Sequence, residues 1–211
     1  MNKLVVYMSM SLDGFIAAAD DGPGRGLGIG GELLHAWLTN GNLSPDSFRP
    51  DHGVNAEVFD EMMATGAVIT GRHTFEWAGD WGGDHHDGVP IYVLTRQAPE
   101  PPVRGNARYV TDLESAVAQA KHAAGDRDVM MHGASAVQAL LRVGLVDELV
   151  IHLVPLLLGS GRRLFDGLPG ETCRLRLIRS LEGDGVLHLR YEVEGPAQPE
   201  VTRIDTGRFQ V

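Results

Sequence analysis

The chain has 211 residues, a length that suits one domain with a full hydrophobic core, or a domain with a small appendage. Hydrophobic residues make up 43% and charged residues 22% of the sequence, so disordered and fibrous classes are excluded. The formal net charge of −10 opposes nonspecific binding to nucleic acid and to anionic membranes. No apolar run approaches the roughly 20 residues of a membrane-spanning helix. We therefore expect a cytoplasmic protein without nucleic-acid or membrane partners.

The first part of the chain combines a strand with long loops. Residues 3–10 have the composition of a strand, and Asp13-Gly14 after them predicts a turn. Six glycines between 22 and 31 predict a mobile surface loop, which could form a lid with Arg25 at its tip. The other elements expected here are a short helix over 32–38, a loop over 40–53 and a helix over 54–64.

From residue 66 onward, strands and helices alternate. Asp112 is a candidate N-cap for a helix that extends to Ala124. Ser135 and Gln138 form a capping-box pattern for a second helix, which Gly144 is placed to end. The expected strands are Ala67–Thr70, Val89–Leu94, Ala107–Val110, Val129–His132 and Glu148–Val154.

The C-terminal part changes from parallel-strand to hairpin patterning. Residues 172–181 and 186–194 alternate in side-chain character around a Gly-containing turn, which predicts an antiparallel hairpin. The single cysteine, Cys173, excludes an intrachain disulfide and lies in the first of these strands, where we expect it to be buried. The whole order predicts an α/β fold with a mostly parallel central sheet flanked by helices. Residues 1–195 would form this domain and 196–211 a peripheral tail.

Three strand-to-helix junctions carry the residue types that bind phosphate groups. In open α/β sheets, ligands bind beyond the carboxyl ends of the strands, where free helix N–H groups attract anions. Glycine lets the backbone approach a phosphate closely, and arginine adds charge-assisted hydrogen bonds. Together the junctions predict a dinucleotide-binding site. The candidate cofactor-binding residues are Gly71, Arg72, Thr74, Thr95, Arg96, Gly133, Ala134, Ser135 and Ala136.

Four ordered motifs make the chain recognisable. They are SMSLDGFIA at 9–17, GRHTFE at 71–76, VLTR at 93–96 and, at 130–165, MMHGASAVQALLRVGLVDELVIHLVPLLLGSGRRLF. This combination resembles the dihydrofolate reductase-like superfamily. Within it, the chain resembles stand-alone homologues of the C-terminal reductase domain of the riboflavin biosynthesis bifunctional protein. The resemblance covers residues 3–193.

The resemblance implies an NADPH-dependent oxidoreductase that transfers a hydride to a small heterocyclic substrate, with 5-amino-6-(5-phosphoribosylamino)uracil as a candidate. It implies that the arginines and threonines of the first two junctions hold the adenosine phosphates, and that residues 133–136 hold the pyrophosphate. The nicotinamide would lie near residues 11–14, where Asp13 is the candidate catalytic residue. Its alternative role is to cap the Asp-Gly turn. The resemblance also implies a homodimer, formed through a sheet edge and apolar C-terminal surface that includes residues 153–158.

Departures from the family pattern leave the substrate open. Enzymes of the riboflavin pathway usually have a lysine after the Ser-Leu-Asp-Gly motif, where this chain has Phe15. Their Asp-Pro-x-Leu-x-x-Arg stretch is replaced by residues 77–87, which begin Trp-Ala-Gly. Dihydrofolate reductase is an alternative, although its pterin-binding carboxylate position holds Leu34, with Glu32 two residues earlier. A third hypothesis is an NADPH-binding protein that performs no reduction.

Several other signals are weaker. Gly26, Gly28 and Gly31 fit a Rossmann string but lie far beyond the first strand. Residues 84–87, Asp-His-His-Asp, have metal-ligand types, yet adjacent side chains point apart and the flanking glycines suggest a solvated loop, so no metal is expected. The remaining histidines on element faces, His35, His132, His152 and His188, are expected to be satisfied structural residues. The three tryptophans, Trp37, Trp77 and Trp81, could line the pocket or pack in the core.

Overall fold

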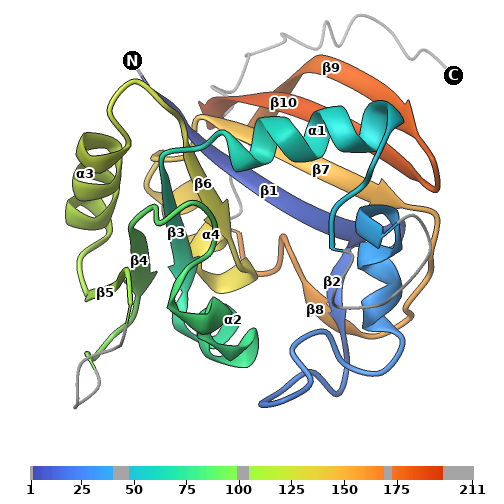
Figure 1. The fold of residues 1–211 in the computed structure, drawn as a ribbon, viewed down its shortest axis with the longest axis horizontal. Helices are drawn as coiled ribbons and strands as arrows, with labels where there is room; N and C mark the ends of the chain where they lie inside the picture. The colour runs from blue at the N-terminus through green and yellow to red at the C-terminus, as the bar shows by residue number, and fades with distance from the viewer. Residues whose placement is uncertain (1, 40–47, 99–104, 169–172, 197–211) are drawn as a thin grey trace, which may run out of the picture.

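An eight-stranded sheet organises the protein, in a computed structural model that describes residues 2–39, 48–98, 105–168 and 173–196. The strand order is β5-β4-β3-β6-β1-β7-β10-β9, and the strands from β5 to β7 in this order are parallel (Figure 1). The hairpin of β9 and β10 adds to β7 in antiparallel orientation. The strands are β1 (Leu4–Ser11), β3 (Ala67–Gly71), β4 (Ile91–Leu94), β5 (Ala107–Val110), β6 (Val129–His132), β7 (Glu148–Val154), β9 (Cys173–Gly183) and β10 (Val186–Pro196).

Helices cover both faces of the sheet and bury both sides of its central strands. Along β1, Leu4 and Val6 pack in the cluster with the helices α3 and α4, whereas Val5 and Tyr7 pack in the cluster with α1 and η1. Burial on both faces explains why the central parallel strands are mainly apolar instead of alternating between apolar and polar residues. The helical elements are η1 (Gly31–Thr39), α1 (Gly53–Met63), α2 (Arg72–Trp77), η3 (Gly79–Gly83), α3 (Leu113–Ala124) and α4 (Ala134–Arg142).

The parallel strands end at different heights along the carboxyl edge of the sheet. Thr70 of β3 pairs with His132 of β6, and Gly71 pairs with Leu94 of β4, so these three strands end in register. Strand β1 extends past the end of β6 to Ser11 and pairs there only with β7. The three predicted junctions therefore meet at one edge of the sheet, beside the protruding end of β1.

A two-stranded sheet that sequence patterns did not predict lies next to this edge. Its strands are β2 (Phe15–Ala18) and β8 (Gly161–Arg163), which pair antiparallel. Gly161 has a φ of 144°, and a Cβ there would collide with the Ala17 carbonyl oxygen. Only glycine permits this close approach of the two backbones.

Most of the predicted elements are confirmed, including the α/β class and the C-terminal hairpin. Asp112 caps α3, since its side chain accepts a hydrogen bond of 2.7 Å from the Ser115 amide. The capping-box prediction is wrong: Gly133 precedes α4 without a side-chain cap, and Gln138 instead donates to the Leu164 carbonyl. The short helix predicted over 32–38 is the 3₁₀ helix η1.

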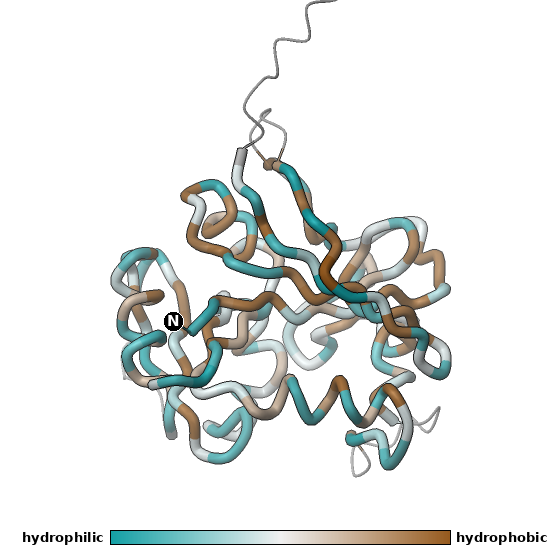
Figure 2. Tube along the Cα trace, turned by 90° about the horizontal axis from the view of Figure 1, so that it is seen from above, coloured by the Kyte–Doolittle hydropathy of each residue, from teal (hydrophilic) through white to brown (hydrophobic). Residues whose placement is uncertain are grey.

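The hairpin explains a second incorrect prediction. Strand β9 is the outer strand of the sheet within the described residues, and its first six residues, which point to both faces, are exposed. Cys173, predicted to be buried, is exposed there. Hydrophobic and hydrophilic residues intermix along the two strands (Figure 2). Strand β10 extends to Pro196, the first residue of the predicted tail, and the remainder of that tail lies outside the described residues.

The helices are short by the standard of membrane-spanning segments. Across the described residues, none combines the length and the hydropathy needed to cross a bilayer.

Candidate active site

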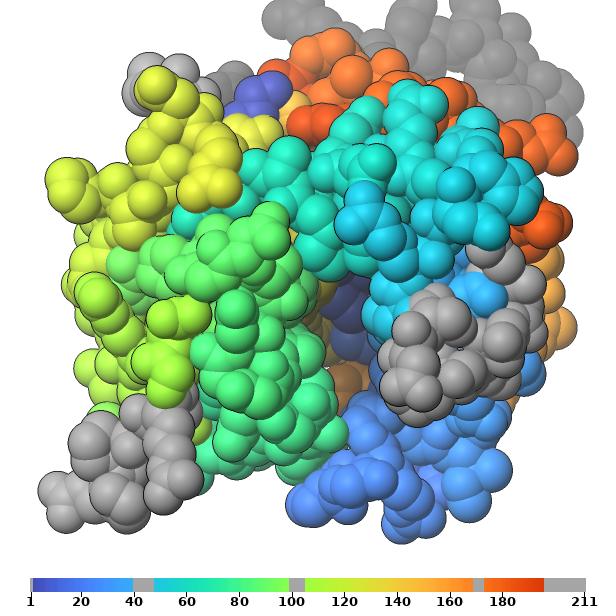
Figure 3. Space-filling view, viewed as in Figure 1, coloured from blue at the N-terminus to red at the C-terminus, as the bar shows by residue number. Residues whose placement is uncertain are grey.

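A cleft of about 1440 Å³ lies at the carboxyl edge of the sheet. Its walls come from the strand ends, α2, η1 and the glycine-rich segment 22–31. The space-filling view shows the molecule hollowed between the segment that contains α2 and the glycine-rich segment (Figure 3). Such a volume accommodates a dinucleotide together with a small substrate.

The structure brings all of the predicted cofactor-binding residues to this cleft. The first junction contributes its residues from the end of β3 and the start of α2, the second from the turn after β4, and the third from the start of α4. The residues that line one continuous cavity are Gly71, Arg72, Thr74, Thr95, Arg96, Gly133, Ala134, Ser135 and Ala136. Their role in binding a cofactor stays a prediction, but their convergence in space meets its geometric requirement.

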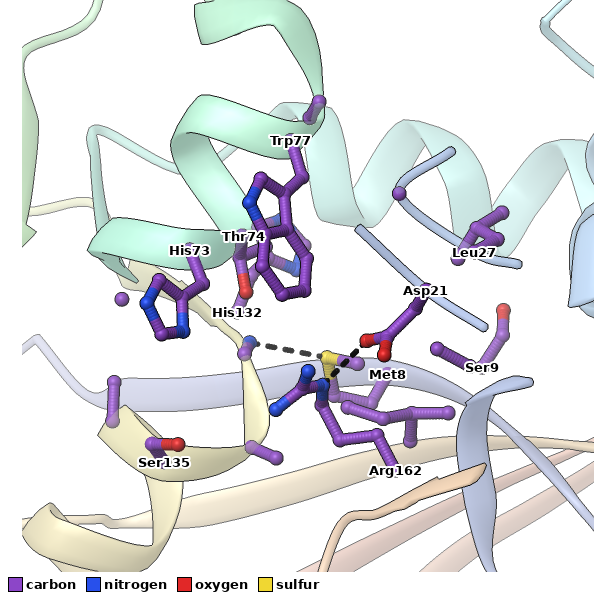
Figure 4. A pocket seen from close by; sticks show the side chains of 18 of the residues that line it. Met8, Ser9, Asp21, Leu27, His73, Thr74, Trp77, His132, Ser135 and Arg162 are labelled. Atoms are coloured by element: carbon purple, nitrogen blue, oxygen red, sulfur yellow. Dashed lines mark hydrogen bonds and ion pairs between the residues drawn. The ribbon is translucent and has the colours of Figure 1, made fainter. Parts of the chain in front are cut away.

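Gly133 is the tightest point of this arrangement. Its φ of 93° lies in the region that favours glycine, and a Cβ there would lie 2.5 Å from Thr74 Oγ1. The Gly133 amide donates to Met8 Sδ at 3.5 Å, one of the contacts drawn in Figure 4. Because α4 begins immediately afterwards, the amides of residues 134–136 have no acceptor within the helix and are available to an anionic group.

Several cationic side chains line the same cleft as these amides. Arg72 Nε pairs with Glu76 Oε1 at 2.6 Å across one helical turn, and this hydrogen bond raises the arginine pKa. Arg96, in the turn after β4, also lines the cleft, as do Arg25 and Arg142. The cleft thus carries positive charge within a chain whose net charge is −10. A locally held anion is the ligand that this distribution favours.

Sequence patterns missed Arg162, which lies on the short strand β8. Its Nε pairs with Asp21 Oδ2 at 2.6 Å, and its guanidinium lies 5.2 Å from the Trp77 ring centre. Figure 4 shows these three side chains directed toward one another, from β8, the loop before the glycine-rich segment and α2. Arg162 therefore links two walls of the cleft. The only available signal was the Arg-Arg pair after a glycine, which by itself indicates no particular role.

The glycine-rich segment faces α2 across the cleft. Arg25, Gly26 and Gly28 line the cavity, and a Cβ at Gly26 would lie 3.0 Å from the Trp77 carbonyl oxygen. Asp20 fixes the segment from its N-terminal side, since Oδ1 accepts from the Ile29 amide at 2.9 Å. This position, over the cavity and against α2, is the one that a lid requires. The lid function itself stays a prediction.

Asp13, the candidate catalytic residue, lies in the turn after β1 and is not among the residues that line the cleft. Its carboxylate accepts hydrogen bonds from Ser11 Oγ at 2.5 Å, the Gly159 amide at 2.7 Å and the Leu158 amide at 3.2 Å. The hydrogen bond from Ser11, followed by those from the two amides, lowers the pKa of the carboxyl. These contacts favour the alternative role, in which Asp13 holds a turn in place.

The substitution Asp13→Asn separates the two roles. An asparagine side chain has one acceptor oxygen instead of two, so it cannot keep all three hydrogen bonds. We expect a lower melting temperature in thermal denaturation and an unchanged dissociation constant for NADPH. A loss of about 100-fold in kcat/KM without a change in melting temperature would instead support a catalytic role.

Aromatic and histidine side chains line the inner part of the cleft. Trp37, Trp77 and Trp81 all contribute to the lining, and Trp37 also belongs to the core. Burial lowers the pKa of both His35 and His132 to about 4, so both rings are neutral at physiological pH. A neutral, largely apolar inner chamber suits an uncharged ring compound better than a second anion.

The segment 84–87 differs from the solvated loop that was expected. His85 Nδ1 lies 2.8 Å from His86 Nδ1, and the His85 ring stacks on His132 at 5.2 Å between centres. Burial lowers the pKa of His85 to about 2. Within the described segments, no three side chains of metal-ligating type are grouped to hold an ion.

The sheet order, the edge hairpin and the cleft define an α/β protein with the dihydrofolate reductase-like fold. The chain belongs to the family of the RibD C-terminal domain, whose model matches residues 2–189. Family membership confirms the resemblance that the four motifs indicated.

Two similar proteins match this chain over nearly their whole length. The uncharacterized protein YwjB from Bacillus subtilis is 27% identical over 191 residues, covering 90% of this chain and 97% of that protein. A putative riboflavin biosynthesis protein from Shewanella sp. PV-4 is similar in structure, with a TM-score of 0.65, 24% identity, and coverage of 91% and 99% of the two chains.

Two further structures are similar in fold. The chain covers 58% of Acinetobacter baumannii RibD, and 92% of this chain is matched, with a TM-score of 0.59 and 19% identity. Dihydrofolate reductase from Enterococcus faecalis, solved with NADP(H) and RAB-propyl, has a TM-score of 0.54 and 12% identity, over 91% of this chain and 96% of that one.

Proposed function

We propose that this protein is an NADPH-dependent reductase that transfers a hydride to a small heterocyclic substrate. The observation that carries the proposal is the convergence of the three predicted phosphate-binding junctions on one cleft with a neutral inner chamber. Membership of the RibD C-terminal domain family supports an oxidoreductase. The structural relative solved with NADP(H) supports a nicotinamide cofactor.

The donor set fits such a cofactor. The amides of residues 134–136 and the Ser135 hydroxyl would bind the pyrophosphate, and the arginines and threonines of the first two junctions would bind the adenosine phosphates. When bound, NADPH supplies a hydride, which carries the two electrons of the reduction. The protein's own contribution is to orient the reactants and to exclude water, which the glycine-rich segment and α2 can do from opposite sides.

Two heterocyclic compounds are candidate substrates. 5-Amino-6-(5-phosphoribosylamino)uracil remains a candidate through the family, with Phe15 and the segment 77–87 as departures. For dihydrofolate, the position that should hold the pterin-binding carboxylate is occupied by Leu34, which is fully buried in the core. The nearby carboxylate of Glu32 lines the cleft, so pterins are kept among the compounds to test. The oxidation of NADPH, followed by absorbance against pyrimidine, pterin and carbonyl compounds, distinguishes these substrates. Tight NADPH binding without turnover of any of them would favour a binding protein that performs no reduction.

Arg96→Ala tests the cofactor assignment. A guanidinium that contacts the additional phosphate of NADPH contributes to the binding of NADPH and not of NADH. We expect the variant to bind NADPH about 10-fold more weakly and to bind NADH with nearly unchanged affinity, as measured by fluorescence titration. Arg108→Ala is the matched control, since Arg108 is exposed on β5 and does not line the cleft. Equal affinities of the wild-type protein for the two cofactors would contradict the assignment.

We also propose a homodimer formed through β9, the outer strand of the sheet. Leu175, Leu177 and Ile178 of β9 are 42%, 53% and 44% exposed, an unusual concentration for large apolar side chains on an edge strand. Leu157, within the apolar segment 153–158, is 69% exposed. Light scattering at micromolar concentration should give a dimer for the wild-type chain and a monomer for Leu177→Glu. A wild-type monomer would reject the proposal.

A further inference from the structure

A chain of buried polar groups lies beneath the inner end of the cleft. His152 of β7 and His188 of β10 face each other across the strand pair, with their Nδ1 atoms 2.8 Å apart. His188 Nε2 lies 3.1 Å from Asn55 Oδ1 on helix α1. His152 and His188 are 2% and 3% exposed, so water cannot substitute freely for any of these contacts. The hydrogen atoms on these three side chains can therefore be assigned from their hydrogen-bond partners alone.

Asn55 determines which atom donates and which accepts in each of these hydrogen bonds. Its Nδ2 lies 3.0 Å from the Asp184 carbonyl oxygen and 3.3 Å from the Trp37 carbonyl oxygen, and carbonyls only accept. The other amide atom is therefore the oxygen, which must accept a hydrogen bond from His188 Nε2. The neutral ring of His188 then has a lone pair on Nδ1, which accepts from the Nδ1–H group of His152.

His152 Nε2 is left as an unprotonated nitrogen. It is buried and has no hydrogen-bond partner among the described residues. Ser9 lies opposite His152 on the adjacent strand, where its Oγ accepts from the Trp37 indole N–H group at 2.9 Å and makes no hydrogen bond with His152 Nε2. Desolvation lowers the pKa of His152 well below its usual value, which keeps the ring neutral. A buried acceptor without a donor is an unfavourable arrangement unless a ligand completes it.

The location of His152 indicates which ligand that is. His152 and Trp37 line the cleft, with ring centres 4.6 Å apart. Strand β7 lies on the far side of β1 from β6, which leads into the phosphate-binding residues 133–136. His152 is thus at the end of the cleft opposite to the proposed cofactor cradle.

We propose that His152 Nε2 accepts a hydrogen bond from a ring N–H group of the substrate and so selects planar heterocycles that present such a donor. A carbonyl or carboxylate in that position would face the nitrogen lone pair with its own lone pairs and be rejected. The residue acts by recognition and carries no proton in the reaction. The inference rests on the proposed function for the assignment of the opposite end of the cleft to NADPH.

Nitrogen NMR of the ¹⁵N-histidine-labelled full chain tests the tautomers before any ligand is added. We expect a protonated Nδ1 and an unprotonated Nε2 for His152, and the opposite tautomer for His188. The ligand probes are uracil and pteridine-2,4-dione at millimolar concentration with saturating NADPH, each paired with its 1,3-dimethyl derivative, which has no ring N–H group. At least one N–H compound should shift the Nε2 resonance in the direction of an accepted hydrogen bond and bind about 10-fold more tightly than its dimethyl partner.

His152→Phe keeps a ring of similar size and removes the acceptor. We expect this variant to lose the preference for the N–H compound and to keep its affinity for NADPH. His35→Phe, which removes another imidazole from the same cleft, should keep the preference. A protonated Nε2 in the wild-type chain, or the absence of a response to both N–H probes, would overturn the inference even if His152→Phe failed to fold. Failure of NADPH to bind the wild-type chain would instead reject the proposed function.

Discussion

Gly133→Ala should weaken NADPH binding by at least about 100-fold, since displacements of about 1 Å in a binding site can have effects of this size. The new Cβ would lie 2.5 Å from Thr74 Oγ1, and the backbone φ of 93° strains any side chain. To relieve both, the start of α4 must move away from α2, which separates the amides proposed to bind phosphate from the Thr74 hydroxyl. Fluorescence titration with NADPH measures the change.

Gly144→Ala is the matched control for this substitution. Gly144 follows the other end of α4 with a φ of 68°, and a Cβ there would meet nothing within 4 Å. It therefore introduces comparable backbone strain without a collision near the cleft. We expect a modest decrease in melting temperature and unchanged NADPH affinity. If both variants bind NADPH like the wild-type chain, the third junction does not hold the cofactor.

Phe75→Ala should lower the free energy of unfolding by about 3–5 kcal/mol, the usual cost of removing a fully buried aromatic ring. Phe75 is the buried residue of the six-residue helix α2, and its ring contacts Trp81 and Tyr109 at 5.6 and 6.3 Å between centres. So short a helix depends on packing for its stability. Because α2 also carries Arg72 and Thr74, NADPH affinity should decrease together with stability.

Urea denaturation measures this effect, and Phe165→Ala provides its control. Phe165 is 37% exposed, so removing its ring should cost much less than removing that of Phe75. Phe75→Leu should recover most of the stability, because leucine refills part of the volume. Similar losses for both alanine variants would mean that α2 is not anchored through Phe75.

The sequence patterns that predicted the sheet correctly were those with a strong physical cause. Strands such as Ile91–Leu94 are buried on both faces and therefore consist of continuous apolar runs. The short strands β2 and β8 were missed because their pairing depends on a close backbone approach at Gly161, which no periodicity reveals. Cys173 was placed wrongly because a strand composition does not distinguish an edge strand from a central one.

The candidate site was predictable where the same types of residue recurred at the carboxyl ends of several strands. Small, hydroxyl and cationic residues after three strands that are neighbours in the sheet led to a single cleft, since parallel strands end at the same edge. Arg162 and His152 could not be found in this way. A histidine within an apolar strand is the same pattern whether or not its second nitrogen has a partner, and only the tertiary contacts with His188 and Asn55 distinguish the two cases.

The central position of β1 has a consequence for biosynthesis. This strand is translated before its partners β6 and β7, which begin only at Val129 and Glu148. More than half of the described chain must therefore be translated before the strand gains its first neighbour. Until then its apolar residues stay exposed, and such unpaired strands are prone to aggregation. A chaperone that shields this strand during synthesis should accordingly raise the yield of folded protein.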